Sequence, residues 1–493
     1  MNESENELVR VRRDKLERLI QKGINPYPSR YDRTHSNQES INLFESLEVI
    51  EEAGYKTEPV SVAGRMMSYR NMGKVAFADI LDGESQLQVM FRRNLLPDSF
   101  ETLSDLDIGD WIGVKGPLFR TRTGEITVEV HDYTLVCKTL RPLPEKFHGL
   151  TDQEIRFRQR YLDLISNPDS RHIAKMRSHV ITSIREFMNA KGFLEVETPI
   201  LVPVAAGGMA QPFTTHHNQL SRDLYLRIAT ELHLKRLIVG GLEKVYEIGK
   251  IFRNEGVDLT HNPEFTTMES YESFADYNDV MTMVEELVFS IANKILGTPI
   301  VEFGEHKLDF TPPWPRIDLL QEIKKRSGIN FLDHSNIESM KTAMQAIGID
   351  VSQQISWPGL MDKLISSTVE DSLIQPCFLV DYPVEMSPLA KPTTNNPKIV
   401  ERFEGFVAGM EICNAFTELN DPIDQRQRFE EQESLRSTFK DEDTDRLDED
   451  FLLAIEHGMP PTGGLGIGID RLIMLFSGST TIREVVLFPQ MRT

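Results

Sequence analysis

The segment Phe252–Tyr271 constrains the fold more than any other, because it reads as two alternating runs joined by a polar turn over 256–263. Alternate side chains of a strand share one face, so each run presents a row of functional groups on one side. The rows and the turn supply Arg253, Glu255, His261, Phe265, Thr267, Glu269 and Tyr271. A solvated antiparallel hairpin is the simplest interpretation. The functional alternative is a surface for a phosphorylated, aromatic, charged ligand.

Length and composition limit the class of protein. A chain of 493 residues can hold two or three domains, and 40% hydrophobic residues is typical of a globular protein. The net charge of −22 argues against nonspecific coating of nucleic acid but leaves local basic patches open. Three widely spaced cysteines predict neither a disulfide framework nor a zinc cluster. Because we find no long apolar run and no secretory signal, we expect a cytoplasmic protein without a membrane partner.

The first 142 residues divide into two parts. A helical extension is expected over 1–57, and its basic cluster between 10 and 22 suits either a solvated amphipathic helix or an RNA contact. From 58 to 142, five short alternating runs separated by turn signals predict a closed antiparallel barrel of the OB-fold type. Such barrels hold single-stranded nucleic acid against aromatic and polar side chains.

The barrel offers four candidate contacts for nucleic acid. They are Arg65 at a strand end, Phe77, Gln88 and Glu125. The alternation alone makes Phe77 a core residue, and only the barrel interpretation favours a role in base stacking.

A proline-containing linker over 143–170 leads into a domain of the α+β class over 171–493, with a mainly helical insertion around 303–400. The domain begins with a long amphipathic helix that ends at Gly192 and continues into a strand. This helix and strand suit either internal packing or a homodimer interface.

Two features near the start of this domain, a glycine loop and the first turn of a helix, could contact a ligand. Gly207 and Gly208 form a flexible pair where backbone can approach a ligand. Glu231 lies in the first turn of a later helix, where it can satisfy the helix dipole or pair with Lys235 four residues on. These structural roles are as consistent with the pattern as a binding role.

Acidic residues recur on the strand-like segment 405–420. Glu411 and Glu418 flank Asn414 and Phe416, and their odd spacing places them on different faces unless a bulge intervenes. Two carboxylates beside a polyphosphate suit Mg²⁺, since hard cations take oxygen ligands. Exposed acids on a strand are the alternative.

The last distinctive stretch, PTGGLGIGIDRLIMLF, is a strand that enters a helix. Gly464, Gly466 and Gly468 alternate, which leaves one strand face bare for a flat group, and Arg471 follows at the start of the helix. The stretch is neither a Walker A loop nor a dinucleotide fingerprint, because the lysine is missing and the glycines lie within a strand.

Together these stretches resemble the three signature motifs of class II aminoacyl-tRNA synthetases. The motifs are the helix and strand ending at Pro199, the hairpin from Phe252 to Glu269, and GLGIGIDRL from Gly464 to Leu472. The order of the motifs and the N-terminal barrel resemble the aspartyl, asparaginyl and lysyl subgroup. The segments RPLPEKFHGL, RQRYLDL, FRNEG, HNPEF and ELND are most similar to bacterial-type lysyl-tRNA synthetases, and the resemblance covers nearly the whole chain.

The resemblance implies a six- or seven-stranded antiparallel sheet flanked by helices, a homodimer, and activation of L-lysine by ATP before transfer to tRNA(Lys). It implies catalytic roles for Arg253, Arg471 and Glu411, and Mg²⁺ held by Glu411 and Glu418. The other implied ATP contacts are Glu255, His261, Asn262, Phe265 and Gly468. The implied lysine contacts are Gly207 or Gly208, Glu231, Glu269, Tyr271, Asn414, Phe416 and Glu418. In the barrel, Arg65, Phe77, Gln88 and Glu125 match positions that read the anticodon.

The acids favour lysine among the possible substrates. A cationic side chain should meet carboxylates, whereas an aspartate pocket needs basic residues, and we find none beyond the phosphate-binding arginines. Aspartyl- or asparaginyl-tRNA synthetase activity is one alternative, and a synthetase-like RNA-binding protein without catalysis is another. A relative that lysylates a protein is less consistent, because such relatives lack the barrel.

Overall fold

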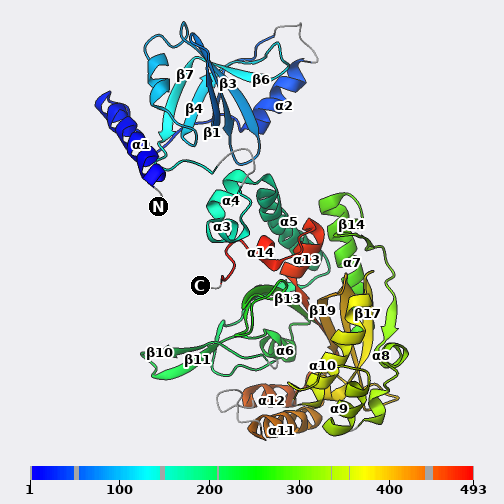
Figure 1. Ribbon diagram of the computed structural model, residues 1–493. Helices are drawn as coiled ribbons and strands as arrows, with labels where there is room; N and C mark the ends of the chain where they lie inside the picture. The colour runs from blue at the N-terminus through cyan, green and yellow to red at the C-terminus, as the bar shows by residue number, and fades with distance from the viewer. Residues whose placement is uncertain are drawn as a thin grey trace. The chain divides into compact units, whose positions relative to one another are not determined.

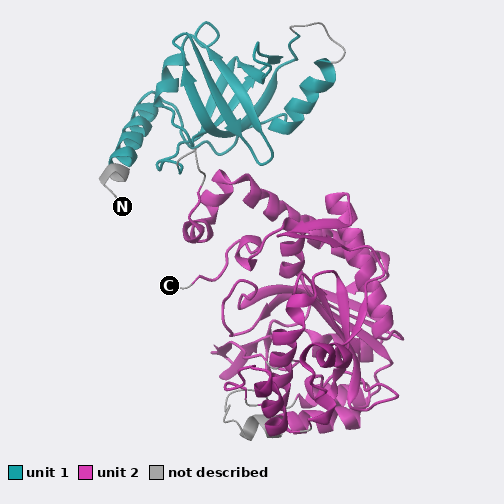
Figure 2. Ribbon diagram, turned by 45° about the vertical axis from the view of Figure 1, so that its right-hand side comes forward, with its two compact units in different colours: residues 1–149 teal, residues 150–493 magenta. Residues whose placement is uncertain are grey.

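The computed structural model describes residues 3–48, 55–144, 150–207, 210–334, 336–354, 356–438 and 448–491. The chain forms two compact units, Met1–Gly149 and Leu150–Thr493 (Figure 2). Figure 1 shows a strand-rich first unit and a second unit in which helices surround one large sheet. Within the described ranges, no helix combines the length and apolarity needed to cross a membrane.

The first unit is the predicted barrel, built on a seven-stranded sheet with the order β5-β6-β3-β2-β1-β4-β7. Its strands are β1 Val60–Asn71, β2 Val75–Leu81, β3 Gln86–Arg92, β4 Trp111–Gly116, β5 Leu118–Arg120, β6 Ile126–Val130 and β7 Asp132–Cys137. Its helices are α1 Glu3–Gln21, α2 Asn37–Glu48 and the short η1 Phe100–Asp105. The five expected runs become seven strands because the fourth breaks at Pro117, which cannot donate to a ladder, and the fifth breaks at His131.

The barrel closes at Gly116. The backbone of β6 approaches so closely that a Cβ there would lie 1.8 Å from the Glu129 carbonyl oxygen. The Glu129 N–H donates to the Pro117 carbonyl at 2.9 Å, and the His131 N–H donates to the Lys115 carbonyl at 2.8 Å. One pair, β3 with β6, is parallel, so the barrel is not wholly antiparallel.

The basic cluster of α1 is largely bound to this barrel. Lys15 Nζ lies 2.7 Å from Asp107, while Arg18 and Lys22 share Asp105 at 2.9 and 2.7 Å. These side chains therefore attach the helix to the barrel. Part of the basic cluster thus has a structural role, a question that the sequence left open.

The second unit is built on an eight-stranded sheet with the order β16-β17-β18-β19-β20-β13-β12-β8. In that order the strands are Arg316–Asp318, Cys377–Pro383, Ile399–Val407, Met410–Thr417, Thr462–Gly468, Glu264–Ser273, Lys244–Phe252 and Leu194–Glu195. The six inner strands pair antiparallel, and the outermost strands β16 and β8 each pair parallel with their neighbour. The sheet is thus larger than the six or seven antiparallel strands expected.

Helices cover one face of this sheet through alternating residues. Met268 and Ile467 point into a core formed with α5 Pro168–Ala190, α7 Tyr277–Leu296 and α13 Ile469–Ser477. The residues that alternate with them along β13 and β20 face the opposite side of the sheet, where α6 Glu231–Val239 and α12 Glu449–Glu456 pack beside Tyr271. The open part of that second face is where a cavity forms.

The remaining elements surround this framework. Two small sheets contain β9 Leu201–Val202, β10 Thr214–His217 and β11 Arg222–Leu226, and β14 Ile300–Phe303 with β15 His306–Asp309. Further helices are α3 Gln153–Arg158, α4 Arg160–Ser166, α11 Pro422–Thr438, α14 Ile482–Val485 and the one-turn η4 Val384–Met386. The helical insertion comprises α8 Leu319–Ser327, η2 Phe331–Asp333, α9 Ile337–Ala346, α10 Trp357–Thr368 and η3 Glu370–Ser372. It lies between β16 and β17, so it is narrower than 303–400.

A buried ion pair closes the base of the barrel. The fully buried Asp110 accepts hydrogen bonds from Lys138 Nζ at 2.9 Å, the Thr139 N–H at 2.8 Å and the Asp107 N–H at 2.8 Å. The Lys138 side chain is also inaccessible to solvent. A buried ammonium that loses one of its carboxylates is costly.

We therefore expect Asp110→Ala to lower the free energy of unfolding of the first unit by about 3–5 kcal/mol. Urea unfolding followed by tryptophan fluorescence measures this, since Trp111 lies on β4. The exposed Asp132 provides the matched control, and Asp132→Ala should change stability by less than about 0.5 kcal/mol. Equal unfolding midpoints for the two variants would contradict the assignment.

Candidate active site

A cavity of about 340 Å³ lies over the centre of the large sheet. Strand pairing builds its floor in rows: Glu269, Gly466 and Asn414 form one row, and Tyr271, Gly464 and Phe416 form the next. In each row a glycine of β20 separates side chains from β13 and β19. The side chains therefore form the two walls of a trough whose floor is bare backbone.

The predicted bare face is confirmed, since Gly464, Gly466 and Gly468 all line the cavity. The tightest position is Gly464, where a Cβ would lie 1.8 Å from Glu418 Oε1 and 2.7 Å from Tyr271 Cε1. At Gly466 the nearest atom to such a Cβ is 3.7 Å away. Gly464 is therefore required for Glu418 to reach the cavity.

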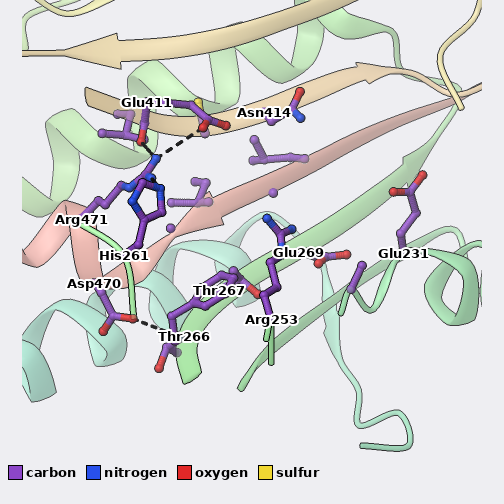
Figure 3. A pocket seen from close by; sticks show the side chains of 18 of the residues that line it. Glu231, Arg253, His261, Thr266, Thr267, Glu269, Glu411, Asn414, Asp470 and Arg471 are labelled. Carbon is purple, nitrogen blue, oxygen red and sulfur yellow. Dashed lines mark hydrogen bonds and ion pairs between the residues drawn. The ribbon is translucent and has the colours of Figure 1, made fainter. Parts of the chain in front are cut away.

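Arg471, His261 and Glu411 lie together at one end of the cavity, and Arg253 lies nearer its centre, beside Glu269 (Figure 3). We call this part, together with Phe265, the arginine end. Arg471 donates from Nη1 to the Glu411 carbonyl oxygen at 2.6 Å, and the same nitrogen lies 3.3 Å from Glu411 Oε2. Its Nη2 is 3.1 Å from His261 Nε2. The Arg253 guanidinium lies 5.4 Å from the centre of the Phe265 ring. This end thus offers two cations and a ring to one ligand.

A buried carboxylate fixes the strand and the helix that carry this end. Asp470 accepts a hydrogen bond from the Thr266 N–H at 2.7 Å and pairs with Arg177 of α5. Arg177 also donates to Thr266 Oγ1 at 2.9 Å. Phe265 and Arg471 are the chain neighbours of these residues, so the contact sets their relative positions.

The other end of the trough carries Glu231, Glu269, Tyr271 and Glu418, and we call it the acidic end. Burial raises the pKa of Glu269 to about 7, and the nearby Glu231 carboxylate adds to the effect. Burial also raises the pKa of Tyr271 well above its usual value, so its phenol stays protonated. This end attracts a cation because several carboxylates share a dry space.

One cation already lies behind the acidic end. Lys235 is fully buried, and its Nζ lies 2.5 Å from Glu231 Oε1 and also pairs with Glu418 Oε2. The Lys235–Glu231 pair confirms the simple i,i+4 interpretation. It also corrects the expectation that no basic residue beyond the arginines lies near the acids, since Glu418, far along the chain, shares the same ammonium. Sequence spacing reveals the first contact but cannot reveal the second.

A bulge brings Glu411 to the cavity. In the pairing of β18 with β19 the register shifts between Gly405 and Phe406, so the odd spacing from Glu411 to Glu418 does not separate their faces. Further acids surround Glu411: burial and the Glu411 charge raise the pKa of Glu370 to about 7. Burial raises the pKa of Glu404 to about 7 against the pull of Arg402, and Glu411 adds to that rise.

Glu404 and Glu370 were not predicted from the sequence. Glu404 comes near the cavity through the pairing of β18 with β19, and Glu370 comes from η3, so both placements depend on the fold. In the described part of the chain, no group of three or more His, Cys, Asp or Glu side chains is preformed around a metal-sized point.

Nearly all predicted site residues line this one cavity. They are Gly207, Glu231, Arg253, Glu255, His261, Asn262, Phe265, Glu269, Tyr271, Glu411, Asn414, Phe416, Glu418, Gly468 and Arg471. Gly208 lies outside the described residues. Gly207 has a φ of +95°, a conformation that favours glycine.

The barrel candidates belong to the first unit. Strand pairing sets Arg65 opposite Leu81 and Gln88 opposite Asp79, so both share a face with Phe77. That face is the outer one: Ala76, Ala78 and Ile80 fill the core, whereas Phe77 is half-buried, so the expectation of a core Phe77 is wrong. Arg65 lies in mid-strand rather than at a strand end, stacked 5.0 Å from the Trp111 ring. Glu125 is exposed in the turn before β6.

Comparison with known proteins agrees with this architecture. Residues 152–492 match the family of class II tRNA synthetases for D, K and N, and residues 60–136 match the OB-fold nucleic acid binding domain. Among similar proteins, the lysine–tRNA ligase of Dehalococcoides mccartyi is 52% identical, with 97% of this chain and 96% of the relative covered.

Two further lysine–tRNA ligases match at full length. That of Moorella thermoacetica is 50% identical, with 99% of both chains covered. That of Bacillus subtilis is 48% identical, with 100% of this chain and 98% of the relative covered. The chain therefore belongs to the class II aminoacyl-tRNA synthetases of the aspartyl, lysyl and asparaginyl group.

Proposed function

We propose that this protein is a lysine–tRNA ligase, which joins L-lysine to tRNA(Lys) at the expense of ATP. The observation that carries the proposal is one cavity lined by two arginines and by the carboxylates of Glu231, Glu269 and Glu418. The full-length similarity to lysine–tRNA ligases supports the same activity. Aspartate would place its own carboxylate against those of the acidic end, which is unfavourable.

In the first step, an oxygen of the lysine carboxylate attacks the α-phosphorus of ATP, forming lysyl-adenylate and releasing pyrophosphate. Such an attack depends on alignment and on neutralising phosphate charge. Arg253 suits the α-phosphate and the attacking carboxylate, because its Nε is buried without a hydrogen-bond partner. Arg471 suits the other face of the base that stacks on Phe265. In the second step a ribose hydroxyl of the tRNA 3′ end attacks the lysyl carbonyl carbon and releases AMP.

The lysine side chain would extend along the glycine floor to the acidic end. Its ε-ammonium would be met by Glu269, Glu418 and the Tyr271 hydroxyl, with Phe416 against its methylene groups. Glu231 and the Gly207 backbone lie where the α-amino group would be held. The same cavity keeps the carboxylate of the substrate near Arg253, as the first step requires.

Carboxylate oxygens near the arginine end fit Mg²⁺. Because Lys235 pairs with Glu418, we propose Glu411 with Glu404, rather than Glu411 with Glu418, as the carboxylates that would hold the ion. Glu404 would then exchange its contacts with Arg402 at 2.6 Å and the Tyr382 hydroxyl at 2.7 Å for the ion. A bound Mg²⁺ would supply charge neutralisation for the phosphates. Glu411 also positions Arg471 through the contacts described above.

Three further proposals accompany this activity. The outer face with Arg65, Phe77 and Gln88 suits unstacked anticodon bases, with Glu125 at its rim.

A homodimer is supported by the exposed apolar side chains of Leu194, Ile200 and Leu201 near β8 and β9. The cytoplasm is the proposed location, since tRNA and ATP are the substrates.

Amino-acid-dependent exchange of pyrophosphate into ATP tests the first step. We expect lysine, and neither aspartate nor asparagine, to support exchange, followed by charging of a tRNA(Lys) transcript. Changing the central anticodon base should lower charging with little effect on exchange, because the barrel contacts RNA alone. Exchange with aspartate or asparagine would favour the alternative enzymes, and absence of any adenylate would favour a non-catalytic RNA-binding protein.

Lysine binding should weaken as the pH falls from 8 to 6. Glu269, with a pKa of about 7, is mostly charged at pH 8 and mostly neutral at pH 6 in the empty cavity. The ε-ammonium stays charged throughout, so it loses one partner and the affinity should drop about tenfold. Calorimetric titration with lysine, without ATP or Mg²⁺, measures this. Glu269→Gln should bind weakly with a flat profile, and an unchanged wild-type affinity would refute the assignment.

Two substitutions separate the metal and lysine sites. Glu404→Gln should raise the Mg²⁺ concentration for half-maximal exchange by about 10-fold or more, with little change in the KM for lysine. Glu418→Gln should raise the KM for lysine and leave the Mg²⁺ requirement nearly unchanged. The reverse pattern would restore the original pairing of Glu411 with Glu418 as metal ligands.

A further inference from the structure

Lys235 is a buried cation that the reaction described above does not use. It lies on α6, has no solvent-accessible surface, and does not itself line the cavity. Its ammonium lies 5.4 Å from the Phe416 ring and 6.0 Å from the Phe451 ring. A lysine that only filled a core could be replaced by an apolar residue, since burying an unpaired ammonium is unfavourable.

The two oxygens of Glu418 have different neighbours. Oε2 pairs with Lys235, whereas Oε1 faces the cavity beside Gly464 and the Tyr271 ring. Neither oxygen accepts a well-aligned hydrogen bond from the described part of the chain, so the ion pair of Oε2 with Lys235 is what distinguishes it from the unpartnered Oε1. Glu418 is itself fully buried, so this free oxygen is a vacant acceptor beside the floor on which a ligand would lie.

The charges of the acidic end lead to the same conclusion. The charge on Glu231 raises the pKa of Glu269 and of Glu418, and Glu269 adds to the rise at Glu418. Burial opposes the charge on Lys235, but the carboxylates of Glu231 and Glu418 outweigh it and raise its pKa. Lys235 is thus the resident cation that balances part of the charge of the acidic end before a substrate arrives.

We propose that Lys235 is a positioning residue that sets the specificity of the acidic end, by holding Glu418 with one oxygen presented to the substrate ammonium. This inference rests on the proposed lysine–tRNA ligase activity. Lys235 occupies the rear oxygen of Glu418 and one oxygen of Glu231, so at Glu418 only Oε1 is left for the substrate ε-ammonium. The ε-ammonium of the substrate would therefore be the second cationic partner of Glu418, beside Lys235.

The variant Lys235→Met tests this, because methionine keeps an unbranched chain but removes the charge. We expect the KM for lysine in pyrophosphate exchange to rise at least about 10-fold, while the KM for ATP changes less than about threefold. Lys191→Met is the matched control: Lys191 pairs with Glu286 at 2.5 Å on the surface, and its loss should leave both constants unchanged.

Chemical rescue provides a second measurement that a purely structural role would not affect. In Lys235→Ala, added ethylammonium can occupy the vacated site and should lower the KM for lysine, whereas an equal concentration of sodium chloride should not. In the wild-type enzyme the same amine competes with lysine and should raise that KM. Rescue in the variant with inhibition of the wild type supports the proposal, and inhibition of both contradicts it.

The outcomes separate the two proposals. If the wild-type enzyme fails to exchange pyrophosphate with lysine, the proposed function is wrong and the inference falls with it. If the wild type uses lysine and Lys235→Met keeps its KM, only the inference is overturned. If Lys235→Met and Lys235→Ala are too unstable to purify, Lys235→Arg decides: a KM for lysine within about threefold of wild type supports the role of the charge, and a 10-fold rise contradicts it.

Discussion

The arrangement of charge around Glu418 is the constraint on which the rest of the cavity depends. A carboxylate without solvent access is stable only with a partner cation, and Lys235 supplies that cation from a different part of the chain. Glu269 has no ion pair as close as this: it accepts a hydrogen bond from the Thr230 N–H at 3.3 Å, and the charge of Arg253 offsets only part of the rise in its pKa, to about 7, that burial and Glu231 cause. A bound ammonium would favour the charged form of Glu269, so this carboxyl helps to select a cationic amino acid.

The large sheet sets the positions of these side chains relative to one another. Antiparallel pairing fixes the rows Glu269–Gly466–Asn414 and Tyr271–Gly464–Phe416, so Glu269 and Tyr271 hold set positions beside the glycine floor. The link between Asp470 and Thr266 ties the last strand and helix to β13 at the other end of the trough. The sheet thus holds the arginine end and the acidic end in place relative to each other. This arrangement suits a substrate whose carboxylate must react while its ammonium is held.

Much of this could be predicted from the sequence, because alternation along a strand is local. Phe265, Thr267, Glu269 and Tyr271 share one face as expected, and the three alternating glycines form the floor. The barrel was predicted for the same reason, whereas the class of the catalytic fold was predicted from the resemblance to class II synthetases. The predictions that failed required knowledge of the three-dimensional structure. Phe77 lies outside the core although the alternation alone predicts a core residue, and Pro117 divides a run that looked continuous. Neither Lys235 nor Glu404 could be linked to the cavity, since their partners lie on other elements.

A crystal structure with lysine and a non-hydrolysable ATP analogue would show where the two charged ends of the substrate lie. We expect the ε-ammonium over Gly464, within hydrogen-bond distance of Glu269 and of Glu418 Oε1, with Lys235 still paired to Glu418 Oε2. We expect the α-phosphate beside Arg253 and the base between Phe265 and Arg471. A lysine side chain directed away from the acidic end, or one that displaces Lys235 from Glu418, would contradict this expectation.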